Sequence, residues 1–349
     1  MNVERIRHAT ANQVMEGSFQ RGKSGACAMR SHAVTGARVK VTAPSTTANL
    51  GPGFDVFGLA HDTFLDTVEI EVTSQNKIEV EVTGVDSSSV SCDSNKNTAG
   101  VVANSLVERL PTGCGLRIRV NKGIPVGKGL GSSGASAAAC AFGLNRIMRL
   151  GLSSDQMIQL AAKGETASAG SPHADNVAAS ILGGFTIIQS YEPFHVIGLS
   201  PPANLRVALA IPNVLTTEKK TEYARAILPK LISIEKMVHN VGQASSMIVG
   251  ILSGDLDLIG RSMIDVVVEP ERAKFVPGYW KIKKSALAAG AAGVAISGAG
   301  PTMIAVVDEE KVPVIQVAEA MKEEFEAEGI DCRAFASKPA KGANIVEER

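Results

Sequence analysis

Residues 121–136 read Asn-Lys-Gly-Ile-Pro-Val-Gly-Lys-Gly-Leu-Gly-Ser-Ser-Gly-Ala-Ser. This glycine-rich stretch follows a predicted strand at 116–120 and precedes a predicted helix at about 134–150 that is rich in small residues. Glycines let the backbone approach a ligand closely and adopt positive φ. A helix start adds unpaired N–H groups and a partial positive charge, and Ser132, Ser133 and Ser136 add hydroxyls. The stretch therefore predicts a cradle for phosphate.

Two better-known phosphate loops do not fit this stretch. Residues 129–134 match the glycine spacing of the dinucleotide-binding fingerprint, but that motif needs a following parallel strand that ends in an acidic residue. Here a second helix is predicted instead, at 153–168. A Walker loop needs Ser or Thr directly after its lysine, whereas Lys128 is followed by Gly129. A loop whose glycines serve only to turn the chain is the remaining structural alternative.

The composition of the chain argues against several classes of protein. With 349 residues and 45% hydrophobic content, the chain can bury a core and predicts about two domains. Its 35 Lys and Arg balance 35 Asp and Glu, and aromatic residues make up 4%, so neither a cationic surface nor a stacking platform for nucleic acid is predicted. Five scattered cysteines without a C-x-x-C pair indicate a reducing, cytoplasmic setting and no zinc site. No apolar run reaches the roughly 20 residues of a membrane helix, so no membrane partner is expected.

Residues 1–35 differ from the rest of the chain. They carry five Lys and Arg against two Glu, without apolar periodicity or the hydrophobic core of a secretory signal. We expect a disordered extension. A transit peptide or a later start at Met29 is the alternative.

Hydrophobic periodicity predicts a mixed α+β chain with a joint at Pro201-Pro202. The joint divides it into an N-terminal domain at 36–200 and a C-terminal domain at 203–349, the second with the alternation of a split βαβ unit. Further strands are predicted at 39–43, 68–72, 78–82, 184–190, 194–199, 205–211, 293–297, 303–307 and 330–336. Further helices are predicted at 97–110, between 217 and 290, and at 312–328.

Three motifs together resemble those of the GHMP kinases, a superfamily of small-molecule kinases. The glycine-rich motif is Pro125-x-x-x-Gly129-Leu-Gly131-Ser-Ser-x-Ala-Ser136. An earlier one is Pro44-x-x-x-x-Asn49-Leu-Gly-x-Gly-Phe-Asp55-x-x-Gly58, and a later one is Ser297-Gly-Ala-Gly-Pro-Thr302. The resemblance covers about residues 38–337 and implies a two-domain GHMP kinase fold: an N-terminal β-rich domain with a left-handed βαβ unit and a C-terminal ferredoxin-like α/β domain.

Within the superfamily, details of the sequence are similar to the homoserine kinases. They are Ala48-Asn-Leu-Gly-Pro-Gly-Phe-Asp55, His173-Ala-Asp-Asn-Val-Ala178, Gly183-Gly-Phe185, Tyr191-Glu-Pro193 and Val268-Glu-Pro-x-Arg272. Gly134 departs from the family, which commonly has Ala there. This resemblance implies transfer of the γ-phosphate of ATP to the side-chain hydroxyl of L-homoserine, the step before threonine synthase, by a homodimer.

The resemblance also implies where ATP and Mg²⁺ bind. Ser133 and Glu165 are the implied metal ligands, and both count among the implied catalytic residues. A lone helical glutamate is otherwise usually exposed to solvent. The ATP-binding candidates are Pro125, Val126, Gly127, Lys128, Gly129, Leu130, Gly131, Ser132, Ser133, Gly134, Ala135 and, for the nucleoside, Asn97. Lys128 is equally compatible with a surface charge.

An amino-acid substrate needs a cation for its carboxylate and an acceptor for its ammonium group. Arg225 and Arg272 are candidates for the first, since a guanidinium can bind a carboxylate with two bonds, and Asp55 is a candidate for the second. The other expected substrate-binding residues are Asn49, His173, Asn176, Thr221 and Gly298. Taken singly, Asp55, Asn49 and His173 are also typical turn or cap residues.

The general base is left open at this stage. Asp175 and Asn176 both lie in the segment where mevalonate-type relatives carry a catalytic aspartate. We favour Asn176 with no side-chain base, which the loose transition state of phosphoryl transfer permits, and keep Asp175 as the alternative. His173 is a less favoured base.

Two other functions remain possible from sequence. One is a GHMP kinase for another hydroxylated metabolite, such as mevalonate or a sugar. The other is an ATP-binding sensor without catalysis, against which the intact Ser133 and Glu165 argue.

Overall fold

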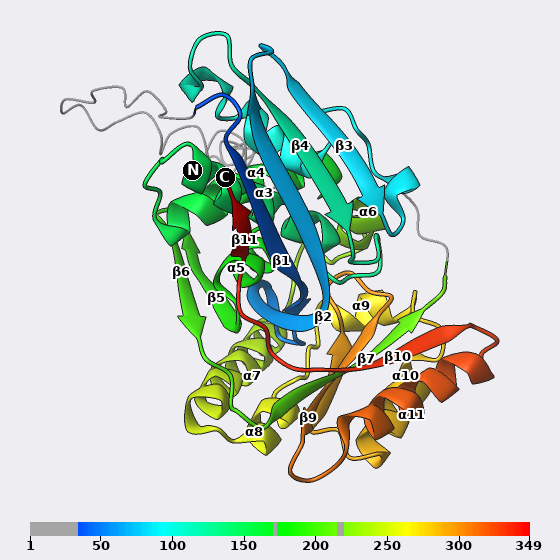
Figure 1. Ribbon diagram of the computed structural model, residues 1–349. Coiled ribbons are helices and arrows are strands. Elements are labelled where there is room, and N and C mark those ends of the chain that lie inside the picture. The colour runs from blue at the N-terminus through cyan, green and yellow to red at the C-terminus, as the bar shows by residue number, and fades with distance from the viewer. Residues whose placement is uncertain (1–33, 170–172, 215–219) are drawn as a thin grey trace.

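The computed structural model describes residues 34–169, 173–214 and 220–349, with the side chains of 167–169, 220 and 221 left out. Within them the strands form two sheets that meet along the middle of the molecule (Figure 1). The first sheet has the order β11-β1-β2-β4-β3, and β5 pairs with β2 and with β6. Its strands are β1 (Arg38–Asn49), β2 (Gly53–Thr73), β3 (Ile78–Gly84), β4 (Gly115–Lys122), β5 (Phe185–Tyr191), β6 (Phe194–Leu199) and β11 (Asn344–Glu348).

The second sheet lies in the C-terminal half and has the order β10-β7-β9-β8. Its strands are β7 (Leu205–Pro212), β8 (Gly293–Ile296), β9 (Met303–Asp308) and β10 (Cys332–Ser337). Helices α10 (Tyr279–Ala288) and α11 (Val314–Ala327) pack on it through a core of their own. The other helices of this half are α6 (Lys220–Ala226), α7 (Ile234–Ser253), α8 (Leu256–Arg261) and α9 (Glu269–Ala273).

The expected βαβ unit is present at the edge of the first sheet. Strands β3 and β4 are parallel, and α2 (Thr98–Asn104) lies between them in the chain. A parallel pair needs such a crossover, because a tight hairpin can join only antiparallel strands. The left hand of this crossover stays a prediction.

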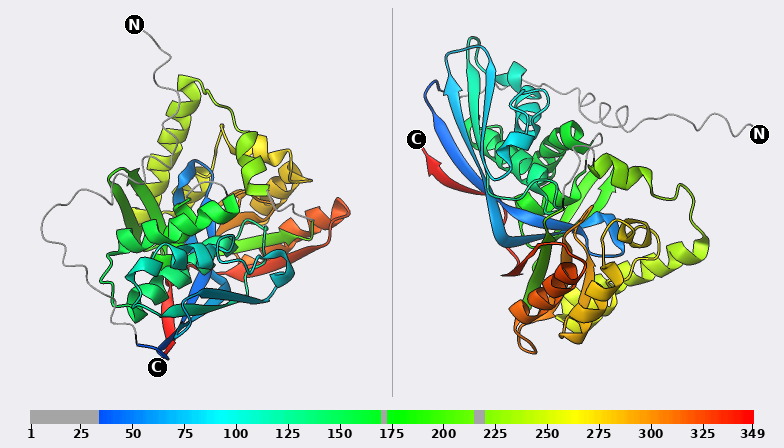
Figure 2. Two further views of the ribbon diagram at one scale, coloured as in Figure 1. Left: turned by 90° about the horizontal axis from the view of Figure 1, so that it is seen from above. Right: turned by 90° about the vertical axis from the view of Figure 1, so that its right-hand side faces the viewer.

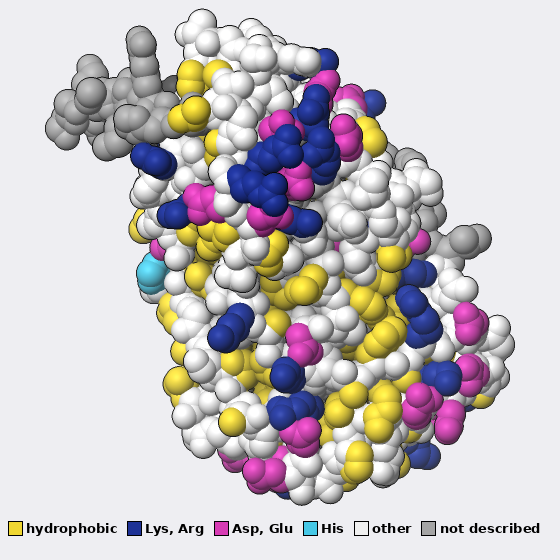
Figure 3. Space-filling view, viewed as in Figure 1, with side chains coloured by type: hydrophobic (Ala, Val, Ile, Leu, Met, Phe, Trp, Pro, Cys, Tyr) yellow, Lys and Arg dark blue, Asp and Glu magenta, His cyan; other side chains and the backbone are white. Residues whose placement is uncertain are grey.

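Alternation along β4 explains why one face of the first sheet is charged. Leu116, Ile118 and Val120 are buried, whereas Arg117 and Arg119 point outward. Arg117 pairs with Glu71 and Glu79, and Arg119 pairs with Glu69 and Glu81. Figure 3 shows this mixed group of basic and acidic side chains over the strands. Both guanidiniums are therefore neutralised where they lie.

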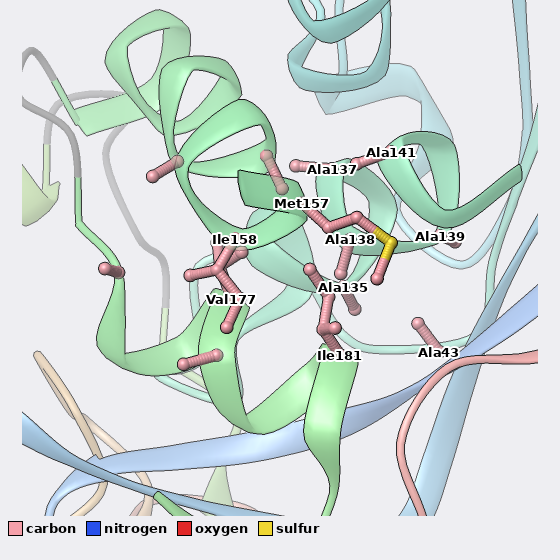
Figure 4. Close-up of a cluster of buried hydrophobic side chains, with 14 of the residues drawn as sticks. Ala43, Ala135, Ala137, Ala138, Ala139, Ala141, Met157, Ile158, Val177 and Ile181 are labelled. Carbon is pink, nitrogen blue, oxygen red and sulfur yellow. The ribbon is translucent and has the colours of Figure 1, made fainter. Parts of the chain in front are cut away.

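The other face of the sheet holds the helix that follows the glycine-rich loop. This helix, α3 (Ser132–Ile147), packs against α4 (Ser154–Ala169), α5 (Asp175–Leu182) and β1 through a row of buried alanines (Figure 4). The alanines are Ala135, Ala137, Ala138, Ala139 and Ala141, each fully buried. Because alanine is small, the helix approaches its neighbours closely, and its first turn is held at a fixed position.

The structure departs from the predicted elements in several places. Strand β2 begins at Gly53, whereas a strand was predicted only at 68–72. The helix predicted at 97–110 ends at Asn104 and is followed by a 3₁₀ turn at Val107–Arg109. Helix α5 was not predicted. Strand β11 was not predicted either: it pairs with β1 in the first sheet, so the end of the range 203–349 lies with the N-terminal half. The division into 36–200 and 203–349 remains a prediction. Strand β11 crosses it, because it belongs to the second range in sequence but to the first sheet in space. Residues 1–33 of the expected disordered extension 1–35 lie outside the described residues.

Across the described ranges, none of the helices combines the length and apolar character that crossing a membrane requires.

Candidate active site

A cleft of about 900 Å³ lies between the glycine-rich loop and the C-terminal half. The loop, α2, α3, α4 and α5 contribute from one side, and Asn213, Arg225, Arg272 and Gly298 contribute from the other. Most of the predicted site residues line this cleft. They are Asn49, Asp55, Asn97, Pro125, Val126, Gly127, Lys128, Gly129, Leu130, Gly131, Ser132, Ser133, Glu165, His173, Asp175, Asn176, Arg225, Arg272 and Gly298.

The glycine-rich loop needs its glycines for space as well as for conformation. Gly129 has φ +80°, and a Cβ there would lie 2.3 Å from the carbonyl oxygen of Ser297. Gly131 has φ +68°, and a Cβ there would lie 1.9 Å from Oγ1 of Thr46. The loop is also tied to its surroundings, because the Ser297 hydroxyl donates to the Gly129 carbonyl at 2.6 Å. The expected rigid cradle is thus anchored to the late motif, Ser297–Thr302.

The three loop serines have different partners. The Ser133 hydroxyl donates to Oε2 of Glu165 at 3.0 Å. The Ser132 hydroxyl instead donates to the Ile124 carbonyl at 3.0 Å, and the Ser136 hydroxyl donates to Asp66 at 2.7 Å. Ser132 and Ser136 therefore stabilise the loop, and Ser133 is the hydroxyl placed with the candidate metal carboxylate.

Two predicted ATP-binding residues lie behind the cleft. Ala135 is fully buried in the core, and its N–H donates to the Gly131 carbonyl at 2.9 Å. Gly134 does not line the cleft and faces Asn176, whose Cβ would lie 3.2 Å from an added Cβ. The structure shows a packing role for both, since small residues there let α3 begin directly under the loop, and their contact with ATP stays a prediction.

Lys128 and Asn97 line the cleft, but both polar groups are occupied. The ammonium group of Lys128 donates to the carbonyls of Pro212 and Val214, at 3.3 and 2.6 Å, and burial lowers its pKa. Asn97 caps α2, where its side-chain oxygen accepts from the N–H groups of Ala99 and Gly100. In this structure Lys128 links the loop to the C-terminal half, and Asn97 is a helix cap.

A buried ion pair under the loop was not predicted. Lys122 and Asp66, 3% and 0% exposed, form an ion pair. The Lys122 ammonium group also donates to the Ser132 carbonyl at 2.7 Å, and Asp66 accepts the N–H groups of Gly123 and Ile124 at 3.0 and 3.1 Å. The pair therefore fixes both ends of the loop. Lys122 opens the glycine-rich stretch, but its partner is 56 residues away and no local signal joins them.

Two buried carboxyl groups face the cleft from α4 and α5. Burial raises the pKa of Glu165 to about 7, with the neighbouring Asp175 acting in the same direction and the Ser133 hydrogen bond opposing it. Burial also raises the pKa of Asp175 to about 7, assisted by Asp55. Such raised values cost stability and are typical of sites where charge is used. A cation in the cleft would relieve this cost.

The far end of the cleft holds Asp55, His173 and Arg225. Nη2 of Arg225 lies 2.9 and 2.7 Å from the two carboxylate oxygens of Asp55. The same nitrogen lies 3.0 Å from Nδ1 of His173. Because a guanidinium only donates, His173 accepts at Nδ1 and carries its proton on Nε2. Burial, together with the Arg225 charge, lowers the pKa of His173, so the imidazole is neutral near pH 7.

Phe54 joins the two arginines and was not predicted from the sequence as a site residue. The guanidinium carbons of Arg225 and Arg272 lie 5.3 and 5.1 Å from the centre of its ring. Arg272 is 7% exposed, and its Nη1 donates to the Gly298 carbonyl at 2.8 Å. Within the described residues its buried Nε makes no hydrogen bond. Phe54 stands inside the quoted early motif, which was the available signal.

The early motif forms a strained turn between β1 and β2. Asn49, Leu50 and Asp55 all have positive φ, at 75°, 50° and 59°. Non-glycine residues in this region are strained and cluster at functional sites. The Asn49 amide compensates by donating to the Gly298 carbonyl at 3.1 Å and accepting the Asp55 N–H at 3.2 Å. The turn thus joins Asp55 to the late motif.

Asp175 and Asn176 both line the cleft at the start of α5. Oδ1 of Asn176 accepts from the Thr46 hydroxyl at 2.8 Å, so the amide directs its donor group away from Thr46. Oδ1 of Asp175 accepts the Asn176 N–H at 2.7 Å. Helix α5 therefore places both candidates together, and the choice between them remains a proposal. The side chain of Thr221, the remaining predicted contact, lies outside the described residues.

Comparison with known proteins agrees with this geometry. Family models described as GHMP kinases N terminal domain and GHMP kinases C terminal match residues 97–184 and 247–327. The homoserine kinase of Methanococcus maripaludis is 42% identical over 311 residues, which are 89% of this chain and 99% of its own. That of Haloarcula marismortui is 40% identical over 305 residues, 87% and 99% of the two chains.

Solved structures give the same answer. The crystal structure of homoserine kinase from Cytophaga hutchinsonii is 35% identical, with a TM-score of 0.82 over 88% of this chain and 97% of its own. Mevalonate kinase of L. major, at 14% identity and a TM-score of 0.65, shares the fold alone. The expected mixed α/β, two-domain fold is confirmed. The chain belongs to the GHMP kinase superfamily and, within it, to the homoserine kinases.

Proposed function

We propose that this protein is a homoserine kinase that transfers the γ-phosphate of ATP to the side-chain hydroxyl of L-homoserine. The products are O-phospho-L-homoserine and ADP, in threonine biosynthesis. One observation carries the proposal: a single cleft joins a glycine-rich helix start to a buried arginine and an acidic group suited to an amino acid. Identity of about 40% to curated homoserine kinases over nearly their whole length supports it.

The phosphate groups of ATP bind at the loop and the first turn of α3. The first N–H groups of a helix have no partner within the helix, and they point toward its N-terminal end together with the partial positive charge of the helix. Here that end opens into the cleft at Gly131, Ser132 and Ser133. The buried Lys122 lies beneath the same turn and holds the Ser132 carbonyl, while Asp66 balances its charge.

Ser133 and Glu165 fit a magnesium ion with few protein ligands. Among the described residues no group of three or more His, Cys, Asp or Glu is arranged to hold a metal ion. Mg²⁺ does not require such a group, because it keeps several waters and shares phosphate oxygens. The Ser133 hydroxyl and the buried Glu165 carboxyl, 3.0 Å apart, form a hard oxygen pair facing the cleft. When bound there, the ion would neutralise charge on the phosphate oxygens.

The amino-acid end binds the charged groups of L-homoserine. Arg272 is the stronger candidate for the carboxylate, since Arg225 already uses one nitrogen on Asp55 and His173. Phe54 holds both guanidiniums in place. Asp55 is the acceptor for the ammonium group. Its pairing with Arg225 leaves lone pairs for a second donor.

The substrate hydroxyl reacts near α5 without a side-chain base. Asn176 does not take the proton, because an amide is not a base. Its oxygen accepts from Thr46, and its NH₂ group donates one N–H to Asp175 at 3.3 Å and orients the substrate hydroxyl with the other. His173 is unsuitable, since its Nδ1 lone pair is taken by Arg225 and Nε2 carries a proton. The substrate oxygen bonds to the γ-phosphorus, the bond from that phosphorus to the bridging oxygen of ADP breaks, and the hydroxyl proton passes to an oxygen of the transferred phosphoryl group. Asp175 is the remaining candidate base.

An ADP-release assay with ATP, Mg²⁺ and a panel of acceptors tests the proposal. The panel is L-homoserine, L-threonine, mevalonate, galactose and no acceptor. Turnover confined to L-homoserine is the expected result. Turnover with another acceptor would replace the substrate while keeping the phosphate loop. ATP binding without turnover for any acceptor would contradict a kinase.

A further inference from the structure

Helix α9, which carries Arg272, is too short to hold its own position. It spans Glu269–Ala273, little more than one turn, and a helix of that length is unstable unless tertiary contacts fix it. The guanidinium group of Arg272 adds little support. Among the described residues it makes one hydrogen bond, to the Gly298 carbonyl, and its buried Nε makes none. The place of the Arg272 charge in the cleft is therefore set by other contacts of α9.

Asp265 holds the N-terminal end of this helix. Its carboxylate accepts the N–H groups of Val268 and Glu269 at 3.1 and 2.8 Å. It also accepts the side-chain amide of Asn240, on α7, at 2.8 Å. These bonds satisfy donors that the first turn of a helix leaves free. They hold the backbone at one end of α9 and leave its orientation to side-chain contacts.

Glu269 ties α9 to α10 inside the protein. The residue is 6% exposed, and its Oε1 accepts from the Tyr279 hydroxyl and from the Lys283 ammonium group, the latter at 3.0 Å. The ammonium group of Lys283 also donates to the Tyr279 hydroxyl at 3.1 Å, which closes a triangle of polar groups. Burial raises the pKa of Glu269, whereas the Lys283 charge and the Tyr279 hydrogen bond oppose that rise. Both partners therefore favour the charged carboxylate.

Helix α10 is a firm support for this cluster. Tyr279 is 4% exposed, and Ile282 and Ala286 on the same helix are fully buried in the core of the second sheet. Figure 2 shows α10 and α11, gold and orange, lying side by side in the C-terminal half, where the two helices are in contact. The cluster around Glu269 therefore fixes the short α9 against a well-packed part of the molecule.

Glu269 also contacts the strand end that receives Arg272. Its Oε2 accepts the N–H of Ile296, the last residue of β8, at 3.4 Å. The Gly298 carbonyl, which accepts from Arg272 at 2.8 Å, lies two residues further along the chain. Residues three apart lie on one side of a helix, so Glu269 and Arg272 make two links between α9 and the late motif. Because Lys283 pairs with Glu269, the Arg272 charge stays available to the cleft.

We infer that Glu269, held by Tyr279 and Lys283, is a positioning residue that fixes the Arg272 guanidinium where it binds the carboxylate of the substrate. Glu269 lies behind the cleft and not in its lining, so it acts through Arg272. The inference rests on the proposed function, because it concerns the amino-acid end of the same cleft. Misplacing a binding group impairs the substrate that it holds. The KM for L-homoserine should therefore respond, and the KM for ATP should not.

Lys283→Met tests the inference in steady-state assays of the full-length protein. Loss of this cation should raise the KM for L-homoserine by about 3–30-fold, within the range of couplings in one hydrogen-bond network. The kcat and the KM for ATP should change by less than about twofold. Lys281→Met is the matched control and should keep wild-type constants, because Lys281 lies on the same helix but pairs with Glu328, at 2.7 Å. Circular dichroism checks that each variant is folded. Tyr279→Phe, a smaller change, should shift the same KM in the same direction and decides the question if Lys283→Met does not fold.

A double variant separates positioning from a general loss of structure. Adding Lys283→Met to Arg272→Ala should raise the KM for L-homoserine by less than about twofold more, because the group to be positioned is gone. Effects that multiply in the double variant would overturn the inference. So would a wild-type KM in both Lys283→Met and Tyr279→Phe, or an equal rise in the KM for ATP. Wild type that does not phosphorylate L-homoserine would instead overturn the proposed function, and this inference with it.

Discussion

The proposed phosphate end and the proposed amino-acid end of the cleft are built from different parts of the chain. The phosphate end comes from one continuous stretch, 121–136, whose backbone forms the cradle. The amino-acid end gathers Asp55, His173, Arg225 and Arg272 from four distant segments, and it is made of side chains. A backbone cradle depends on how the loop is held, whereas a side-chain pocket depends on individual groups. Substitutions at the two ends should therefore impair the protein in different ways.

The largest effect is expected from removing the buried ion pair that supports the phosphate end. Lys122→Met leaves Asp66 buried without its cation, so the free energy of unfolding should fall by about 3–5 kcal/mol, measured by urea denaturation. The matched control is Lys311→Met, which removes an exposed ion pair with Asp257 at 2.7 Å. Because both side chains are exposed, that change should leave the free energy of unfolding nearly unchanged. Equal losses in the two variants would mean that the buried pair does not hold the loop.

Glu165→Gln separates chemistry from binding at the same end. Loss of a charge placed to act in the transition state typically lowers kcat by about 10²–10³-fold. We expect that loss in steady-state assays, with a weakened Mg²⁺ dependence and little change in the KM for L-homoserine. Asp155→Asn is the control on the same helix, where Asp155 pairs with His195 at 2.8 Å. Wild-type turnover and Mg²⁺ dependence in the Gln variant would remove Glu165 from the metal site.

Although Glu165→Gln should lower kcat, it should raise the stability of the protein at alkaline pH. Burial raises the pKa of Glu165 to about 7, above the unfolded value, so the folded state binds a proton that the unfolded state has lost. Stability from this group is present below about pH 4.5 and is lost as pH rises to about 7. Without Mg²⁺ or ATP, Glu165→Gln should thus be more stable than wild type at pH 8, by about 2–3 kcal/mol. Thermal denaturation at pH 5 and pH 8 checks this, and a gain at pH 5 alone would contradict it.

Arg272→Ala tests the amino-acid end. Removing a charge-assisted bond to the substrate carboxylate should lower kcat/KM for L-homoserine by roughly 10–150-fold, or about 1.5–3 kcal/mol, mainly through KM. The KM for ATP should stay nearly constant. The exposed Arg261 on α8 supplies the control, Arg261→Ala. A larger change in the KM for ATP than in the KM for L-homoserine would contradict the distinction between the two ends.

The smallest effect is expected where the two ends meet. If transfer needs no side-chain base, Asp175→Asn should lower kcat by less than about tenfold, whereas loss of a general base typically costs about 10²–10⁴-fold. The pH profile of kcat decides the same question. In wild type, kcat should fall only slightly as the pH drops below about 7, the pKa of Asp175. A large fall that disappears in Asp175→Asn would show that Asp175 is the base.

The difference between the ends also explains what the sequence could predict. The loop and its helix start were predicted from local pattern, because glycine spacing and helix-start signals are contiguous. Arg225 and Arg272 were predicted from the chemistry of an amino-acid substrate, which the family resemblance implied, because the pocket residues come together only by topology. The Lys122–Asp66 pair joins two strands of the sheet, and no local pattern marks it.

The elements that were missed share a physical cause. Helix α5 has eight residues, too few for a clear apolar period, and begins inside the His-Ala-Asp-Asn segment. Strand β11 reads Asn-Ile-Val-Glu-Glu and is mostly exposed, so it lacks the alternation of a half-buried strand. Lys128 was expected either to neutralise phosphate oxygens or to be a surface charge. The two carbonyls that its ammonium group contacts lie more than 80 residues away, so no local pattern marks them. At each of these positions, contacts with residues distant in the sequence determine the structure.

The most direct test of the account follows phosphorus through the reaction by ³¹P NMR, with ATP, Mg²⁺ and L-homoserine. The account predicts one new phosphate-monoester signal, formed in equal amount with ADP and absent when L-threonine replaces L-homoserine. Release of inorganic phosphate without the monoester, or ATP that stays intact while bound, would contradict transfer between the two ends of this cleft.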